Sequence, residues 1–443
     1  MDSSPLALQW VICIDIISAW FLIGVEGQDI SDEEWCGYDR KREGTEMIAI
    51  FLAPVYLLFC FYIWVRAIRW MGACHWLFQM KWTRVSMGIV YTLLVFSILI
   101  AFGSPASLFR TWVKRISNYW LGTLMYLILT IGVADLLRLI CKRLRFQHKE
   151  LLFSPAGHAA VGAVCFAVIL VFTVTGIVTA HCIRTTDYEV SVEKDGGKLD
   201  ELNVVLVADL HLGYNIGNWH MKQMVEKINR QSPDIVLIAG DIFDNEYEAL
   251  RNPEQLECTL SGIRSRYGVY ACYGNHDIEE PVLAGFTFSK KGKKKESNPR
   301  MDEFVKKSGI QLLRDETVLI EDSFYLCGRA DYERPGRGID TRKTPEEITE
   351  DLNREKPILV LDHEPRELQE LADAGADVDL CGHTHDGQMF PGNLLIHLFW
   401  ENPCGYLKKN QMHNIVTSGI GVFGPDMRVG TKSEICNIRI HFQ

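Results

Sequence analysis

The residues with the clearest chemical potential are two histidines, His383 and His385, in the run Leu-Cys-Gly-His-Thr-His-Asp-Gly-Gln. They follow a short, mostly apolar run, Val378–Cys381. Because side chains two residues apart on a strand face the same side, both imidazoles could serve neighbouring metal ions at the end of that strand. Gly382 and Gly387 would let the backbone turn tightly and come close to a ligand.

Upstream, further residues of metal-ligand type each follow a strand-like apolar run. They are Asp209, His211, Asp241, Asn275 and His363. Taken singly, a strand-end Asp or Asn often makes a turn, and a buried His often packs. Ligand sites of α/β sheets gather at the carboxyl ends of strands, so the repetition at five strand ends favours a common metal site.

The donor types indicate which metals such a site would hold. Three oxygen donors and four imidazoles suit Mn, Fe or Zn better than Ca or Mg. Seven ligands are too many for one such ion, so we expect two divalent ions bridged by one carboxylate. A pair of ions about 3.5–4 Å apart can hold a hydroxide between them and stabilise a phosphoryl transfer.

The segments that must position these residues alternate between strand and helix patterns. Asn203–Ala208 and Ile235–Ala239 are continuously apolar, as in strands buried on both faces. Trp219–Asn229 has helical periodicity. Strands dominate later in the chain, so we expect residues 183–443 to form an α/β domain of two packed mixed β-sheets flanked by helices.

Residues 1–182 have a different composition, dominated by long apolar blocks. The blocks are Leu6–Val25, Met47–Val65, Val85–Gly103, Tyr119–Ile140 and Ala159–Cys182. Each is near the ~20 residues that cross a bilayer as a helix. We therefore expect a membrane region of about five transmembrane helices.

The charges of the loops predict the orientation. The loops after the second and fourth blocks carry eight basic residues, against six on the opposite side. The eight are Arg66, Arg69, Lys81, Arg84, Lys142, Arg143, Arg145 and Lys149. Because cytoplasmic loops are enriched in Lys and Arg, residues 183–443 should lie outside the cytoplasm, and we expect a multi-pass plasma-membrane protein.

The 13 cysteines form no C-x-x-C pair, and free thiols weigh slightly against an oxidising compartment.

Three further features have more than one interpretation. Asp135 lies inside an apolar block with Arg138 one turn later, which predicts an ion pair at the membrane edge; Asp15 has no evident partner. The cluster Lys290–Lys295 is either a solvated loop or a surface for an anionic substrate or lipid head groups. The apolar run Leu394–Trp400 is either core or an apolar lip beside the metal site.

The motifs, taken in order, resemble those of calcineurin-like metallophosphoesterases. They are Asp209-x-His211, Gly240-Asp241-x-x-Asp244, Gly274-Asn275-His276-Asp277, His363 and Gly382-His383-x-His385. The later pieces Asp386–Pro391, Ser418-Gly419 and Met427–Gly430 resemble the membrane-anchored branch of that family. The resemblance covers about residues 188–443 and implies the αββα sandwich of the family.

The resemblance also implies a role for each residue. One metal would be bound by Asp209, His211 and His385, the other by Asn275, His363 and His383, with Asp241 as the bridge. His276 would protonate the leaving oxygen or hold the phosphate, and Asp244 would orient His276 through a hydrogen bond. Asn245 stands where the protein Ser/Thr phosphatases of this superfamily have Arg, and Asp277 replaces a Glu, which argues against protein-phosphatase activity.

We therefore expect a membrane-anchored dimetal phosphoesterase. It would hydrolyse a phosphoester or pyrophosphate bond with a metal-activated hydroxide, and its substrate could be a lipid-linked phosphate. A catalytically silent receptor or scaffold is an alternative, against which the complete ligand set and His276 argue. A nuclease is another, disfavoured by the net charge of −10 and the membrane anchor, so we expect no nucleic-acid partner.

Overall fold

The computed structural model describes residues 39–443, except 146, 148, 281, 284–285, 288–297 and 337–338, with the backbone alone for 39–51, 282–283 and 286–287. The apolar block Leu6–Val25, with Asp15, and Lys290–Lys295 lie outside the described residues. The chain divides into two units, Met1–Ile48 and Ala49–Gln443. Every side chain that the structure describes belongs to the second unit.

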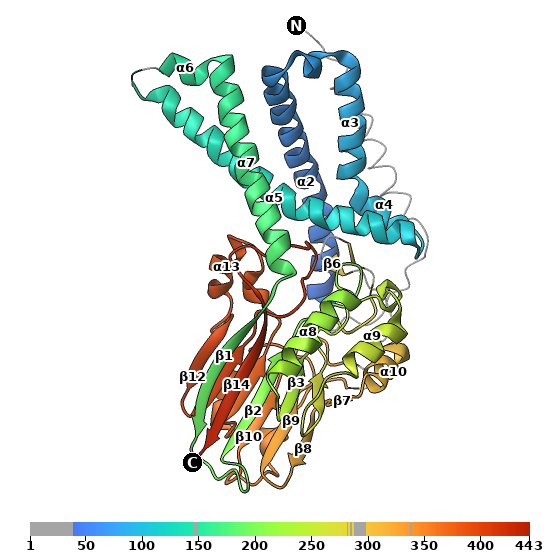
Figure 1. Ribbon diagram of the computed structural model, residues 1–443, viewed down its shortest axis with the longest axis vertical. Coiled ribbons are helices and arrows are strands. Elements are labelled where there is room, and N and C mark those ends of the chain that lie inside the picture. The colour runs from blue at the N-terminus through green and yellow to red at the C-terminus, as the bar shows by residue number, and fades with distance from the viewer. Residues whose placement is uncertain are drawn as a thin grey trace. The chain divides into compact units, whose positions relative to one another are not determined.

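The first third of this unit is helical (Figure 1). The helices are α2 (Asp39–Cys74), η1 (Trp76–Gln79), α3 (Lys81–Val95), α4 (Ser97–Gly103), α5 (Leu108–Arg143), α6 (Lys149–Phe153) and α7 (Pro155–Ala180). Within the described residues, the stretch Leu52–Cys74 and the helices α5 and α7 are long and apolar enough to cross a membrane. The pair α3 and α4, bent by 49°, also passes this test when taken together. The second to fifth apolar blocks therefore each coincide with a candidate span.

Asp135 has a different partner from the one that its sequence neighbours predict. Its carboxylate forms an ion pair with Arg66 of α2 and accepts a hydrogen bond of 2.7 Å from the Tyr62 hydroxyl. The guanidinium of Arg138 instead lies 5.6 Å from the ring centroid of Phe153. The predicted pair of Asp135 with Arg138 is therefore wrong, because the facing helix α2 supplies a cation at the same level.

Two six-stranded mixed sheets form the α/β domain. The first has the order β1-β14-β2-β3-β4-β7. In this sheet β14 and β2 are antiparallel, and all other neighbouring strands are parallel. Its strands are β1 (Ile183–Val192), β14 (Ser433–Phe442), β2 (Glu201–Val207), β3 (Ile235–Ala239), β4 (Val269–Cys272) and β7 (Ile310–Leu312).

The second sheet has the order β12-β13-β11-β10-β9-β8, with an antiparallel strand at each edge. Its strands are β12 (Gly405–Lys409), β13 (Met412–Val416), β11 (Val378–Cys381), β10 (Ile358–Leu361), β9 (Phe324–Gly328) and β8 (Glu316–Ile320). A separate hairpin is formed by β5 (Val282–Leu283) and β6 (Phe286–Thr287).

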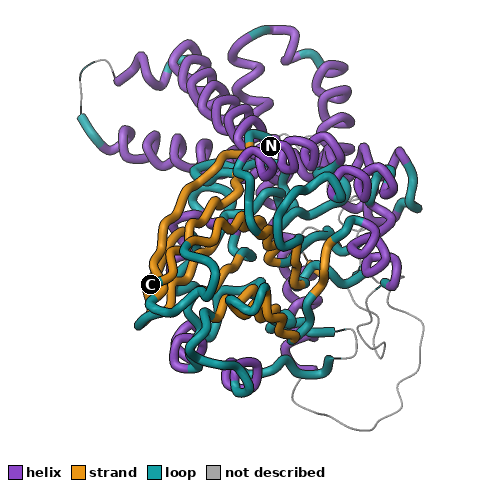
Figure 2. The backbone as a smooth tube through the Cα atoms, turned by 60° about the horizontal axis from the view of Figure 1, so that its bottom comes forward, coloured by secondary structure: helices purple, strands orange, loops and turns teal. Residues whose placement is uncertain are grey.

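Helices cover the outer faces of both sheets, and Figure 2 shows them in purple around the orange strands. On the first sheet pack α8 (Asn218–Arg230), η2 (Tyr247–Ala249), α9 (Pro253–Leu260) and α10 (Pro299–Lys307), and on the second pack α11 (Pro345–Thr349) and α12 (Leu368–Asp373). The short helices η3 (His385–Gly387), α13 (Gly392–Leu395) and η4 (Ile396–Leu398) follow β11 in the chain. One buried cluster joins side chains of both sheets, such as Leu206 and Leu361. Another joins the first sheet to α8, through residues such as Val205 and Met224. The predicted two-sheet sandwich flanked by helices is confirmed.

Candidate metal centre

The candidate ligands stand just beyond the carboxyl ends of five strands. Asp209 and His211 follow β2, and Asp241 follows β3. Asn275 follows β4, His363 follows β10, and His383 with His385 follows β11. Within each sheet these strands run parallel to one another, β2 with β3 and β4, and β10 with β11, so each sheet delivers its polar residues to one edge. The structure brings all seven residues together.

One group consists of Asp209, His211 and His385. A carboxylate oxygen and one ring nitrogen of each histidine lie within 4.8 Å of one another. The Nε2 atoms of the two histidines are 3.0 Å apart, and Nε2 of His385 is 3.9 Å from Oδ1 of Asp209. All three side chains are buried.

The second group consists of Asp241, His363 and His383. Nε2 of His363 lies 3.2 Å from Oδ2 of Asp241 and 3.1 Å from Nδ1 of His383. The amide oxygen of Asn275 is 3.0 Å from both of these ring nitrogens. Asn275 therefore offers a fourth donor atom to this group.

Asp241 connects the two groups through one atom. Its Oδ2 lies 3.2 Å from His363 Nε2 and 3.7 Å from His211 Nε2. Its other oxygen, Oδ1, accepts a hydrogen bond of 2.8 Å from the backbone N–H of His276. The geometry is that of a carboxylate with one oxygen free to face both groups.

The chemistry of this donor set fits two cations. Ring nitrogens of His211 and His385 lie 3.0 Å apart, so one cation could bind a lone pair of each ring. Burial lowers the pKa values of His383 and His385, which favours the neutral form that binds metals. Burial also raises the pKa of Asp209 to about 6, and a cation would offset this cost of burying its charge.

The backbone at these residues has an uncommon conformation. Five of the seven candidate ligands have positive φ: Asp209 at 54°, His211 at 44°, Asp241 at 50°, His383 at 72° and His385 at 51°. For residues other than glycine this region costs of order 1–3 kcal/mol each and persists where the surroundings impose it. Sequence reasoning had no signal for this strain, because neither residue type nor spacing specifies φ.

The two glycines beside the histidines are required by the fold. A Cβ at Gly382 would lie 2.4 Å from the Ala208 side chain and 2.9 Å from Oδ2 of Asp209. Gly387 has a φ of 68°, and a Cβ there would lie 2.4 Å from the backbone of Gly392. Gly382 therefore permits close approach to the end of β2, whereas the sequence suggested close approach to a ligand.

The partner of His276 differs from the expected one. Nδ1 of His276 is hydrogen-bonded to Oδ1 of Asn245, and Asn245 Nδ2 donates to the carbonyl of Ile278 at 3.2 Å. The carboxylate of Asp244 lies 3.7 Å from Nδ1 of His211 instead. The expected hydrogen bond between His276 and the Asp244 carboxylate is therefore wrong, because Asn245 at φ 58° carries its own side chain to this imidazole.

The surroundings of His276 determine its charge. Burial lowers its pKa to about 4, so the imidazole is neutral at pH 7. Because Asn245 Oδ1 accepts, Nδ1 carries the ring proton. The ring of Phe423 lies 4.5 Å from that of His276 and 5.7 Å from that of His211, between centroids. Phe423 was not among the residues singled out in the sequence, where a lone Phe carries no signal.

Arg428 is a second residue whose role the sequence did not indicate, although it lies in the Met427–Gly430 piece. It is fully buried and donates to the carbonyls of Ser418 at 2.6 Å and Gly421 at 2.7 Å. It also donates to the carbonyl of His385 at 3.3 Å. Arg428 therefore ties the loop of His385 to the segment that follows β13.

The apolar run Leu394–Trp400 is split by the structure into two environments. Leu394, Leu395, Leu398 and Phe399 are 61%, 51%, 77% and 77% exposed, and we call these four residues the apolar lip. Trp400 instead contacts the site, with its ring 5.2 Å from that of His383 and 4.6 Å from the Arg366 guanidinium. The core interpretation is wrong for the lip.

Helix α5 contacts the loops that follow β2 and β3 and carry His211, Asp241 and Asp244. Arg110 donates to both carboxylate oxygens of Glu246, at 3.0 and 2.7 Å, and Arg115 donates to the carbonyl of Tyr214 at 2.6 Å. A cavity of about 260 Å³ lies between α5 and these loops, with Lys114, Asp244 and Phe423 among its lining residues. A candidate membrane helix thus forms one wall beside the site.

Comparison with known proteins agrees with this architecture. Residues 202–387 match the calcineurin-like phosphoesterase family. A transmembrane protein with metallophosphoesterase domain from Danio rerio is 29% identical over 347 residues, which cover 74% of this chain and 73% of that protein. The Bos taurus protein of the same description is 29% identical, over 62% of this chain and 61% of its own length.

A third relative has a stated reaction. The UDP-2,3-diacylglucosamine pyrophosphatase of Chlamydia trachomatis is 23% identical over 263 residues, which cover 52% of this chain and 78% of that protein. The chain therefore carries a calcineurin-like metallophosphoesterase domain, and it is similar to transmembrane proteins with metallophosphoesterase domain.

Proposed function

We propose that this protein is a membrane-anchored dimetal phosphoesterase that cleaves a phosphoester or pyrophosphate bond in an amphiphilic substrate. The observation that carries the enzyme assignment is the pair of donor groups that share Oδ2 of Asp241. The first ion would be held by Asp209, His211 and His385, the second by Asn275, His363 and His383. Divalent Mn, Fe or Zn fits these nitrogen and oxygen donors.

The bound ions would supply an activated water and neutralise the charge of the phosphate. His276 would act on the leaving oxygen or hold the phosphate, because Asn245 occupies Nδ1 and leaves Nε2 available. An anionic phosphate beside the imidazole would raise the pKa of His276 from its low value and favour the proton-donating form. The complete set of ligand side chains favours this enzyme over a silent receptor.

The exposed apolar lip supports an amphiphilic substrate. Its four side chains lie within the 14 residues that follow His385, and they expose large apolar surface of the kind that marks lipid or ligand contact. The relative named for UDP-2,3-diacylglucosamine shows that a family member acts on a lipid-like pyrophosphate.

We further propose, from the count of basic residues in the loops, that the α/β domain lies outside the cytoplasm at the plasma membrane. Protease shaving of intact cells tests this, and a domain protected until the cells are broken would contradict it.

The enzyme assignment is tested on the full chain in lipid nanodiscs. Two bound ions per chain and metal-dependent hydrolysis of p-nitrophenyl phosphate are expected. Asp241→Asn should lower both the metal content and the rate, because one carboxylate serves both groups. The control is Asp200→Asn, an exposed carboxylate just before β2. Full metal content and rate in Asp241→Asn would exclude the bridge.

The substrate class is tested with the double variant Leu398→Ser/Phe399→Ser. Burying these side chains from 77% exposure is worth about 2–5 kcal/mol together. The ratio of kcat/KM for dodecyl phosphate in mixed micelles to that for p-nitrophenyl phosphate should therefore fall at least tenfold. The control is Leu319→Ser on β8, which is 44% exposed. An unchanged ratio would remove the lip from substrate binding, while metal-dependent turnover would still support the enzyme.

A further inference from the structure

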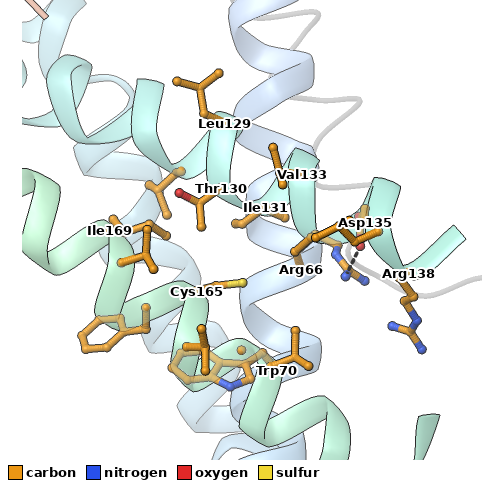
Figure 3. A pocket seen from close by; sticks show the side chains of 18 of the residues that line it. Arg66, Trp70, Leu129, Thr130, Ile131, Val133, Asp135, Arg138, Cys165 and Ile169 are labelled. Atoms are coloured by element: carbon orange, nitrogen blue, oxygen red, sulfur yellow. Dashed lines mark hydrogen bonds and ion pairs between the residues drawn. The ribbon is translucent and has the colours of Figure 1, made fainter. Parts of the chain in front are cut away.

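A cavity of about 930 Å³ lies among α2, α5 and α7, with Trp70, Ile131 and Ile169 among its walls (Figure 3). Sites for small ligands measure roughly 300–1,000 Å³, so the cavity can hold a sizeable molecule. Val133 and Val164 line it and are 55% and 63% exposed, so the cavity opens on the outer surface of the helices. Because all three helices are long and apolar enough to cross a membrane, lipids would surround this surface in a bilayer.

One edge of the cavity is cationic. Arg66 and Arg138 both line it, together with Asp135, which pairs with Arg66 (Figure 3). Within the described part of the chain, no carboxylate forms an ion pair with Arg138, and the buried Nε of Arg66 has no hydrogen-bond partner. Two guanidinium groups against one carboxylate leave one net positive charge at this edge.

We propose that this cavity binds an anionic phospholipid of the bilayer. An acyl chain would lie among the apolar side chains, and the phosphate would lie at the guanidinium of Arg138. Uncharged hydrocarbon alone would leave this cation without a counter-ion, whereas a phosphate oxygen satisfies it with charge-assisted hydrogen bonds. Basic pockets between transmembrane helices recognise anionic head groups by this chemistry.

The cavity also reaches the α/β domain. Phe390 lines it, and the backbone N–H of Phe390 donates to the carbonyl of Val429 at 2.8 Å. Tyr126 and Phe172 line it as well, stack at 4.9 Å and pack with Met389. A bound lipid would therefore contact the segment that follows His385.

The test measures lipid retention, so it does not depend on catalysis. The full-length protein in detergent is incubated with equimolar phosphatidylglycerol and phosphatidylcholine and re-isolated, and the retained lipids are quantified by mass spectrometry. Wild type should enrich phosphatidylglycerol about fivefold, the factor that one nearby cation contributes. Arg138→Gln should abolish the enrichment. The matched control Arg143→Gln removes an exposed charge from the last turn of the same helix, outside the cavity lining. This variant should keep the enrichment of phosphatidylglycerol.

A second variant tests the cavity itself. The Thr130 side chain points into it (Figure 3), so Thr130→Trp should fill the space and lower the retention of both lipids. If the wild-type protein retains the two lipids in the ratio supplied, the proposal is overturned. It is also overturned if Arg138→Gln and Arg143→Gln lose the enrichment of phosphatidylglycerol to the same extent. Wild-type retention by a folded Thr130→Trp variant would place the lipid elsewhere and also overturn it.

Discussion

Two adjacent substitutions, Asn245→Ala and Asp244→Asn, should separate proton handling from metal binding. Oδ1 of Asn245 is hydrogen-bonded to Nδ1 of His276, whereas the Asp244 carboxylate lies 3.7 Å from Nδ1 of His211. The two side chains are neighbours in sequence but act on different imidazoles. Their variants should therefore change different measurable quantities.

The expected sizes follow from these contacts. Asn245→Ala leaves the ring N–H of His276 without its acceptor, which costs about 1–3 kcal/mol for a buried donor. If this cost falls on the transition state, kcat drops roughly 5- to 150-fold. Asp244→Asn removes a carboxylate beside a candidate metal ligand, and the loss of such a partner lowers metal affinity about 10–100-fold.

The assay measures kcat for p-nitrophenyl phosphate against Mn²⁺ concentration, together with metal content by mass spectrometry. Asn245→Ala should keep its metal affinity and lose rate at every concentration. Asp244→Asn should recover most of its rate at saturating metal. Asn245→Asp, which keeps an acceptor for Nδ1, should recover part of the rate lost in Asn245→Ala.

The opposite pattern would refute this reasoning. If Asp244→Asn lowers kcat at saturating metal as much as Asn245→Ala and leaves metal affinity unchanged, Asp244 acts through His276. The partner assignment from the structure would then be incorrect, and the arrangement that family resemblance implied would hold.

Three further predictions concern stability. Burial lowers the pKa of His220 from 6.5 to about 4, so between these pH values the folded state binds fewer protons than the unfolded state. The free energy of unfolding should therefore fall by about 3 kcal/mol as the pH falls from about 6.5 to 4. The melting temperature of His220→Gln should depend less on pH than that of the wild type, and an equal dependence would contradict this prediction. Arg110→Met leaves the partly buried carboxylate of Glu246 without the guanidinium that it binds and should cost about 1–3 kcal/mol, between the values for exposed and buried pairs. The double variant with Glu246→Leu should recover most of this free energy in denaturant unfolding. A cost below about 0.5 kcal/mol for Arg110→Met would show that the pair does not couple α5 to the loop. Gly382→Ala should lower the free energy of unfolding by about 1–3 kcal/mol through overpacking. The control Gly217→Ala has no atom within 4 Å of the added Cβ and should not incur this cost. Equal unfolding midpoints of the two variants would contradict the predicted clash.

Much of the fold could be read from local patterns. The second to fifth apolar blocks coincide with candidate spans because length and composition alone decide whether a helix can cross a bilayer. The buried strands of the first sheet were recognisable because strands covered on both faces are continuously apolar, as in Val204–Val207. The seven candidate ligands could be proposed because each follows such a strand and the carboxyl ends of parallel strands share an edge.

Partners between segments far apart in the chain were decided only by the tertiary structure. Asp135 has a cation one turn away in its own helix, yet it pairs with Arg66 of α2, and the sequence holds no information on which helix lies opposite. The division of Leu394–Trp400 into an exposed lip and a Trp400 packed on His383 likewise depends on what covers each side chain.

The same reason separates Asp244 from Asn245. In sequence they are adjacent polar residues of one motif, and either could reach an imidazole. The positive φ of Asn245 and the placement of β4 beside β3 bring its amide to His276, while Asp244 faces His211. Residue types and spacing therefore determined which chemistry the site can perform, and the packing of the two sheets decided which atom meets which.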